Sequence, residues 1–183
     1  MNLWLVRHAQ PLIDAGVCYG ASDILADENA TLQVARRLAG ELPHGLRLIT
    51  SPLQRCARLA AALQALRPDI TFQTDRRLAE MNFGRWELHR WVDIPAADIT
   101  QWTDNFGTCR FGDAESVQEL MDRVAALWDE TSAAQTDAVW ITHAGVIRAA
   151  MLLSQGVRQV AQASQWPRAA VAFGEVLTVA SRN

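Results

Sequence analysis

Apolar runs of four or five residues recur along the chain, separated by longer stretches with helical periodicity. Runs of this length, rich in Leu, Val, Ile and Trp, are typical of strands buried on both faces of a sheet. Four strands are predicted in this way: 3–6, 46–50, 70–74 and 138–142. Because strands and helices alternate, the pattern predicts an α/β fold with a mostly parallel central sheet and helices on both faces.

Capping residues mark the helices between these strands. Helices are predicted over four stretches: 31–42, 51–66, from 115 or 116 to 128, and from about 146. Thr31 and Ser51 stand where a side chain caps a helix, and Pro52 follows at the first helical position. Near the C-terminal end, the apolar residues on either side of Gly174, 169–173 and 176–180, predict a closing hairpin.

The stretch from Leu78 to Gly112 breaks this alternation. Aromatic residues stand there among polar ones: Trp86, Trp91, Trp102, Phe106 and Phe111. A long aromatic insertion of this kind is typical of a lid or a binding loop. The alternative is a small helical subdomain with its own aromatic core.

Composition narrows the class of protein. The chain has 183 residues, 50% of them hydrophobic and 20% charged, so residues 1–183 are expected to form a single domain. The net charge of −3 gives no electrostatic footprint for nucleic acid or an anionic membrane, and neither is an expected partner. Cys18, Cys56 and Cys109 have no CxxC spacing, so we expect free thiols in a reducing compartment. No signal or membrane segment is apparent, and the expected location is the cytoplasm.

All 17 basic residues are Arg, and the chain contains no Lys. This excludes a P-loop lysine, a Schiff base and a lysine general base. A guanidinium group remains suited to gripping a phosphate or carboxylate through two parallel hydrogen bonds.

Reactive side chains follow three of the predicted strands. The first strand ends in Arg7-His8, the strand 138–142 ends in His143, and Arg55 lies in the first turn after the strand 46–50. Because the carboxyl ends of neighbouring parallel strands meet at one edge of a sheet, these residues are expected to lie together. Taken singly, the Arg7-His8 pair also fits a surface position, and His143 fits a buried structural histidine.

Four motifs, in order, carry a family resemblance: Leu5-Val6-Arg7-His8, Ser51-Pro52-Leu53-Gln54-Arg55, the segment from Leu78 to Glu87, and Thr142-His143-Ala144-Gly145. Together they resemble the histidine phosphatase superfamily (phosphoglycerate mutase-like) over nearly the whole chain. The element Cys18-Tyr19-Gly20-x-Ser22-Asp23 is most similar to the alpha-ribazole phosphatase branch. One departure is Ala9-Gln10-Pro11, where the family commonly has Gly-Glu-Thr.

The resemblance implies a phosphoglycerate mutase-like fold and a set of roles. The implied catalytic residues are His8 as nucleophile, Glu80 as proton donor, and His143 as a further hydrogen-bond donor to the phosphoryl oxygens. The implied phosphate-binding groups are Arg7, Arg55 and the helix start at Ala144. Candidate residues of the substrate pocket are Gln10, Asp14, Tyr19 and Gly20. No metal or other cofactor is implied, because the arginines supply the positive charge.

The resemblance therefore implies a phosphomonoesterase that acts through a phosphohistidine. The implied substrate is alpha-ribazole 5′-phosphate, in assembly of the cobalamin nucleotide loop, so the expected partner is a small phosphorylated metabolite. The alternatives are a broad-specificity histidine phosphatase or a mutase-like enzyme acting on another small phosphorylated metabolite. A zinc hydrolase built on His8, His143 and a carboxylate is a third alternative, and a non-catalytic binding module is a fourth.

Overall fold

A five-stranded sheet organises the protein, and its strands run in the order β3-β2-β4-β1-β5. The computed structural model describes residues 1–180. The strands are β1 (Asn2–Arg7), β2 (Arg47–Thr50), β3 (Phe72–Thr74), β4 (Ala138–Thr142) and β5 (Val176–Ala180). The first four are parallel to one another, and only β5 runs antiparallel, beside β1. The predicted mostly parallel α/β sheet is thus confirmed.

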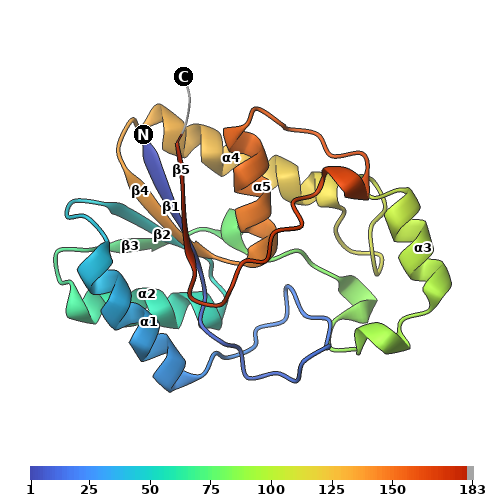
Figure 1. The fold of residues 1–183 in the computed structure, drawn as a ribbon, viewed down its shortest axis with the longest axis horizontal. Coiled ribbons are helices and arrows are strands. Elements are labelled where there is room, and N and C mark those ends of the chain that lie inside the picture. Colours follow the sequence, from blue (N-terminus) through green and yellow to red (C-terminus); the bar gives the residue numbers. More distant parts are fainter. Residues whose placement is uncertain (181–183) are drawn as a thin grey trace.

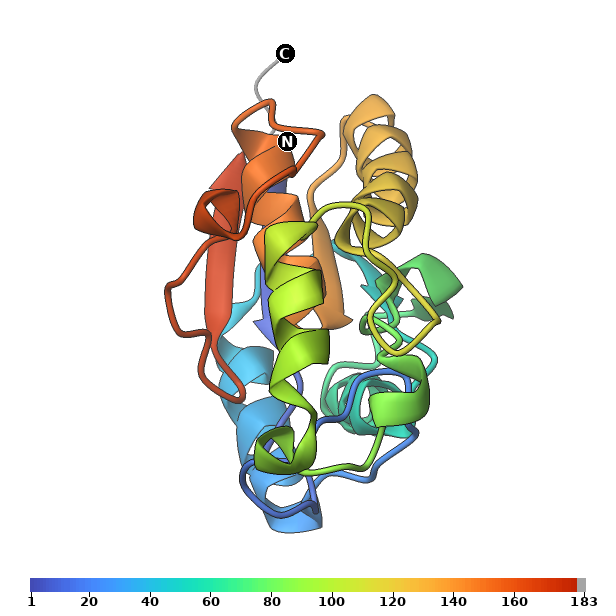
Figure 2. The ribbon, with the colours of Figure 1, turned by 90° about the vertical axis from the view of Figure 1, so that its right-hand side faces the viewer.

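Helices cover both faces of this sheet (Figure 1). They are α1 (Glu28–Glu41), α2 (Gln54–Leu66), α3 (Ala96–Asp104), α4 (Val117–Ala133) and α5 (Ala144–Ser154). Short 3-10 turns lie at Arg76–Leu78, Gly84–Trp86, Trp91–Asp93 and Ala163–Gln165. α1 and α2 pack together on one face, and α4 and α5 on the other. Figure 2 shows α3 standing in front of the sheet, within the segment that follows β3.

Alternation along the central strands divides the core into two layers. Leu5 and Trp140 pack into the cluster that contains α4 and α5. Val6 and Ile141, one position further along each strand, pack into the cluster that contains α1 and α2. Successive side chains of a strand point to opposite faces, so an uninterrupted apolar run is the pattern that a doubly covered strand requires.

α1 and α2 begin at residues other than those predicted, whereas α4 begins where predicted. α1 begins about one turn earlier than expected, because the Asp27 carboxylate accepts a hydrogen bond from the Ala30 N–H (2.7 Å). α2 begins after Leu53, so the expected Ser51 cap is wrong. The Ser51 hydroxyl accepts from the Leu53 N–H (3.3 Å), ahead of the helix, and contacts His143. α4 begins as predicted, and Ser116 forms a capping box with Glu119.

The predicted C-terminal hairpin is wrong. Only 176–180 forms a strand, and it pairs with β1 rather than with residues 169–173. The Gly174 N–H donates to the carbonyls of both Arg7 (3.1 Å) and His8 (3.0 Å). This contact ties the residues before β5 to the carboxyl end of β1. A hairpin would instead have paired those residues with β5.

The aromatic segment packs as part of the core instead of standing free as a lid. The rings of Trp102 and Phe111 stack with centroids 4.5 Å apart, and Trp91 stacks on Phe111 at 5.9 Å. The backbone N–H of Trp91 donates to the Gly16 carbonyl (2.9 Å), and this hydrogen bond links the segment to the loop after β1. These rings belong to the same cluster as α4 and α5, so the segment does not have a separate core of its own.

All three cysteines are free, as the sequence predicts. Among residues 1–180, none of the helices combines the length and the apolar character needed to cross a bilayer.

Replacing Phe111 by Ala tests whether the aromatic segment is structural. Phe111 is 2% exposed, so the cavity left behind should lower the free energy of unfolding by about 3–5 kcal/mol in urea denaturation. Val92, in the same segment, is 84% exposed, and Val92→Ala should change the free energy by about 0.5 kcal/mol or less. Equal effects of the two variants would mean that the segment is a loosely attached lid.

Candidate active site

The carboxyl ends of three neighbouring strands meet at the candidate site. β4 lies between β1 and β2, and Arg7 is paired with Thr142 in the register. His8 follows β1 and His143 follows β4, so their ring centroids are 5.2 Å apart. Arg55 reaches the same edge from the first turn of α2. The structure therefore brings together the residues that the sequence placed at strand ends.

A cavity of about 390 Å³ opens at this edge. Its polar wall consists of Arg7, His8, Tyr19, Arg55, Glu80, His143 and Arg148. Its aromatic wall consists of Phe83, Trp91, Trp102, Phe106 and Trp166. A ligand in this cavity would meet both cations and flat aromatic rings.

His8 is held as a neutral ring with one free nitrogen. Its Nδ1 lies 2.7 Å from the Ala9 carbonyl oxygen, which can only accept, so Nδ1 carries the proton. Nε2 then keeps its lone pair. Burial lowers the pKa of His8 to about 3, and the charges of Arg55 and Arg7 act in the same direction. At neutral pH this imidazole is neutral, which is the form that a nucleophilic histidine requires.

Arg7 is held at the cavity wall by the chain before β5. Its guanidinium carbon lies 3.8 Å from the centre of the Phe173 ring, and Nη1 donates to the Val171 carbonyl (2.5 Å). Burial lowers the pKa of Arg7 from its usual value, but the group stays charged at neutral pH. The cation is thus fixed next to His8.

Arg55 is fully buried and connects three parts of the site. Its Nη1 and Nη2 donate to the carbonyls of Ser22 (2.7 Å) and Gly20 (2.6 Å), and its Nε donates to Nδ1 of His143 (3.2 Å). A guanidinium has five N–H donors, so two remain for a ligand. Arg55 therefore fixes the loop after β1 and still presents positive charge to the cavity.

His143 is held by protein groups at both ring nitrogens. Its Nδ1 accepts from Arg55, so Nε2 carries the proton of the neutral ring, and Nε2 lies 2.8 Å from the Ser51 hydroxyl oxygen. Burial, with the charge of Arg55, holds the pKa of His143 well below its usual range. Both nitrogens are thus engaged by protein groups. In this arrangement the ring has no free N–H to donate to a phosphoryl oxygen.

Glu80 lies across the cavity at the N-terminus of α5. Its Oε2 accepts from the Gly145 N–H (3.0 Å), and its Oε1 accepts from the Met81 N–H (3.0 Å). A side chain at position 145 would intrude on this carboxylate, because a Cβ there would lie 2.3 Å from Oε1 of Glu80. Ala144 lines the cavity beside Gly145, so the first turn of α5 faces the site.

Glu87, the other carboxylate of the same motif, has a structural position. It accepts hydrogen bonds from the backbone N–H groups of Gly20, Ala21, Ser22 and Phe83 and from the Ser22 hydroxyl. Although burial opposes ionisation, these hydrogen bonds hold the pKa of Glu87 below its usual value. Glu87 is an anchor for the loop after β1.

Of the four predicted substrate-pocket residues, only Tyr19 lines the cavity. Gly20, the next residue, packs against the Met81 carbonyl so closely that a Cβ would overlap it. Gln10 and Asp14 are exposed and do not line the cavity, so the structure does not bring them to it. After Ala9 the chain pairs with residues 25–27 and turns outward, which no side-chain pattern indicates.

Arg148 is a cavity residue that the sequence reasoning missed. It lies on α5 four positions after Ala144, and residues at this spacing share one helix face. The position of Ala144 at the site was predicted, so helical periodicity was the signal that would have found Arg148. Phe173 and Val171 were also missed, because the tail was expected to form a hairpin.

The zinc alternative gains no support from the side-chain arrangement. Within residues 1–180, no group of three or more His, Cys, Asp and Glu side chains is placed to share a metal ion. The ring nitrogens of His143 and the Nδ1 of His8 are already engaged.

Comparison with known proteins places these features in a family. The model of the histidine phosphatase superfamily (branch 1) matches residues 3–173. TTHB049 from Thermus thermophilus is 27% identical, with a TM-score of 0.74 over 98% of this chain and 93% of that one. A search of curated proteins gave no match.

Two other solved structures share the fold at lower identity. Mycobacterial glucosyl-3-phosphoglycerate phosphatase is 22% identical, with a TM-score of 0.72 over 85% of this chain and 80% of that one. Alpha-ribazole phosphatase from Shigella flexneri is 21% identical, with a TM-score of 0.74 over 86% of this chain and 81% of that one. These matches cover at least 85% of this chain, and the expected phosphoglycerate mutase-like fold is confirmed.

Replacing Gly145 by Ala should displace the Glu80 carboxylate while leaving the fold intact, because the overlapping atom is the end of a flexible side chain. We expect kcat/KM for an alkyl phosphate to fall by about tenfold or more. Gly40→Ala is the matched control, since a Cβ there meets nothing within 4 Å. The control should keep full activity, and its helix should gain up to about 1 kcal/mol. Unchanged activity of Gly145→Ala would show that the carboxylate position is unimportant.

Proposed function

We propose that this chain, which belongs to the histidine phosphatase superfamily, is a phosphoric monoester hydrolase that acts without a metal, through a phosphohistidine at His8. One observation carries this proposal. The Ala9 carbonyl holds the proton of His8 on Nδ1, so the Nε2 lone pair is free beside two arginines. A neutral imidazole surrounded by fixed cations is suited to attack an anionic phosphoryl group.

In the first step, Nε2 of His8 forms a bond to phosphorus as the ester P–O bond breaks. Arg7 and Arg55 balance the charge on the equatorial oxygens, where the transition state spreads it. Glu80 gives its proton to the leaving alkoxide. The ring becomes cationic when Nε2 is phosphorylated, and the Ala9 carbonyl that accepts from Nδ1–H stabilises that charge.

In the second step, water replaces the histidine. Glu80, now a carboxylate, accepts a proton from the water as its oxygen bonds to phosphorus and the P–N bond breaks. Inorganic phosphate leaves, and His8 returns to its neutral form. The proton that Glu80 gave in the first step is thereby restored, and the cycle closes without another reactant.

Alpha-ribazole 5′-phosphate is the substrate that we propose. Its phosphate would lie between Arg7 and Arg55, and its flat benzimidazole would lie against the aromatic wall that includes Trp102 and Phe106. The motif from Cys18 to Asp23 supports this choice, because Tyr19 lines the cavity and Ser22 fixes the loop. The alpha-ribazole phosphatase from Shigella flexneri shares the fold, which is consistent with the proposal.

The covalent intermediate can be trapped directly. Brief incubation with a ³²P-labelled phosphomonoester should give label on the protein that is stable to base and lost in acid. His8→Ala should abolish this label. His44→Ala, a control at an exposed histidine outside the cavity, should retain it. Label that persists in His8→Ala would move the nucleophile to another residue and refute the proposal.

The aromatic wall predicts a preference for a phosphate ester that carries a base. Stacking of one base on aromatic rings contributes about 1–3 kcal/mol. The kcat/KM of alpha-ribazole 5′-phosphate should therefore exceed that of ribose 5-phosphate by about tenfold or more, measured by phosphate release. Equal values would remove alpha-ribazole phosphate as the substrate, without affecting the phosphohistidine. Isomerisation of 3-phosphoglycerate without phosphate release would instead identify a mutase.

A further inference from the structure

The chain that carries Glu80 has no regular secondary structure to hold it. Residues 79–83 lie between the 3-10 turns Arg76–Leu78 and Gly84–Trp86 and pair with no strand. The carboxylate itself is fixed by two backbone N–H groups, those of Gly145 and Met81. Those contacts orient the side chain only if the backbone beneath it stays in place. Some other part of the protein must therefore fix this backbone.

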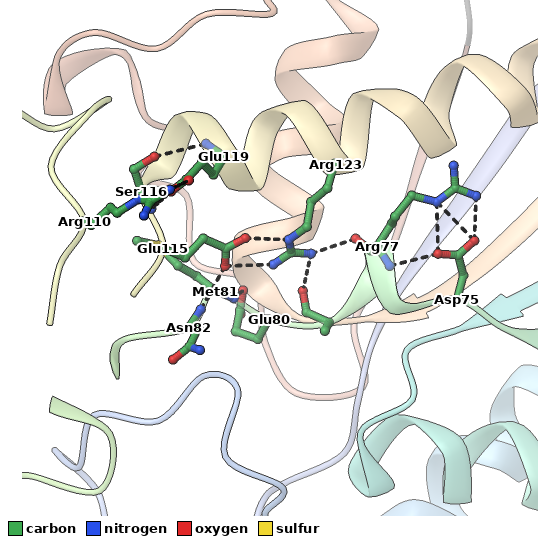
Figure 3. Close-up of polar contacts among 11 residues, drawn as sticks. Asp75, Arg77, Glu80, Met81, Asn82, Arg110, Glu115, Ser116, Glu119 and Arg123 are labelled. Carbon is green, nitrogen blue, oxygen red and sulfur yellow. Dashed lines mark hydrogen bonds and ion pairs between the residues drawn. The ribbon is translucent and has the colours of Figure 1, made fainter. Parts of the chain in front are cut away.

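Arg123, on α4, holds the backbone before Glu80. Its Nη1 donates to the carbonyls of Arg77 and Ala79, at 2.7 Å each. Figure 3 shows the guanidinium reaching from the helix to this segment. The two carbonyls lie on the N-terminal side of Glu80 and have no strand partner, so Arg123 supplies the restraint that a sheet would otherwise give.

Glu115 holds the backbone after Glu80. Its Oε2 accepts from the Asn82 N–H (2.9 Å), and its own N–H donates to the Asn82 carbonyl (3.3 Å). Glu115 is also paired with Arg123 through two contacts, Nε to Oε1 at 2.6 Å and Nη2 to Oε2 at 3.1 Å. One bidentate ion pair therefore grips the chain on both sides of Glu80 (Figure 3).

The position of the pair separates its role from that of the catalytic groups. The side chains are 21% and 16% exposed, so solvent screens their attraction less than that of a surface pair. Neither residue lines the cavity that holds His8. Both line a solvent-open depression behind it, and Glu80 lines the cavity and the depression alike. Arg123 and Glu115 thus reach the backbone of the acid but not the substrate.

We propose that Arg123 and Glu115 are positioning residues for the proton transfer by Glu80, an inference that rests on the acid role given to Glu80 under the proposed function. Proton transfer requires donor and acceptor within about 2.6–3.2 Å. A displacement of about 1 Å can lower a rate by about 100-fold. The pair therefore acts on the proton transfers of Glu80, first to the leaving group and then from the attacking water, and not on phosphate binding; the first of these transfers can be tested separately.

The test compares two leaving groups in the phosphorylation step. A p-nitrophenolate leaves without a proton, whereas the alkoxide of ribose 5-phosphate needs one. Single-turnover rates are measured for wild type, Arg123→Lys and Glu115→Gln, with Glu80→Gln as the reference. Lysine presents a single compact ammonium and cannot bind both carbonyls and both carboxylate oxygens. Arg158→Lys is the matched control, because Arg158 pairs with Asp129 of α4 in the same two-point manner on the exposed surface.

Arg123→Lys and Glu115→Gln should slow phosphorylation by ribose 5-phosphate about tenfold or more, and that by p-nitrophenyl phosphate less than threefold. Glu80→Gln should show the same selectivity more strongly, and Arg158→Lys should show none. A thermal melt checks that each variant folds. If Arg123→Lys does not fold, Glu115→Gln decides alone, because Gln keeps an acceptor oxygen for Asn82 while removing the charge from the ion pair.

Three outcomes would overturn the inference, and they differ in their consequences for the proposed function. Equal losses with both esters in Arg123→Lys and Glu115→Gln, beside a selective Glu80→Gln, would reduce the pair to general structural support. Wild-type behaviour of both variants would show that residues 79–83 keep their position without the ion pair. Equal losses in Glu80→Gln would remove Glu80 as the acid, and with it both the inference and that part of the proposed function.

Discussion

The parallel pairing of β1 with β4 is the constraint on which the rest of the site depends. The register sets Arg7 beside Thr142, and the His8 N–H continues it by donating to the Thr142 carbonyl (3.1 Å). Because both strands are buried on both faces, a slip of one residue would turn every side chain into the wrong layer. The core thus fixes the register, and the register fixes where the two histidines meet.

Burial and nearby positive charge together keep both histidines neutral. Burial alone disfavours an imidazolium, and the nearby guanidinium of Arg55 adds to that effect for both rings. The same groups that keep His8 neutral would attract a phosphate dianion, so the resting protein is prepared for its ligand without any change in protonation. With no Lys in the chain, every cation of the site is a guanidinium that stays charged when buried.

The sequence predicts this site wherever regular structure sets the geometry. Strand ends and helix starts carry Arg7, His8, Arg55 and His143, and the spacing of parallel strands suffices to bring them together. The prediction fails where segments without regular secondary structure determine the geometry, as for Gln10, Asp14 and the tail before β5. The partners of His143 and the grip on the Glu80 backbone were also not predictable, because they involve carbonyls and hydroxyls that leave no periodic pattern. Arg148, by contrast, could have been predicted, because it shares a helix face with Ala144, which the sequence had already assigned to the site.

The attachment of Arg7 to the tail has a consequence for the order in which the protein is made. Arg7 and His8 leave the ribosome before the Val171 carbonyl and the Phe173 ring that hold the arginine, which lie 164 or more residues later. Contacts so distant along the chain form late and slow the search for the native state. A nascent chain therefore carries His8 long before Arg7 is fixed beside it, and the pocket is complete only after residue 173 has been synthesised.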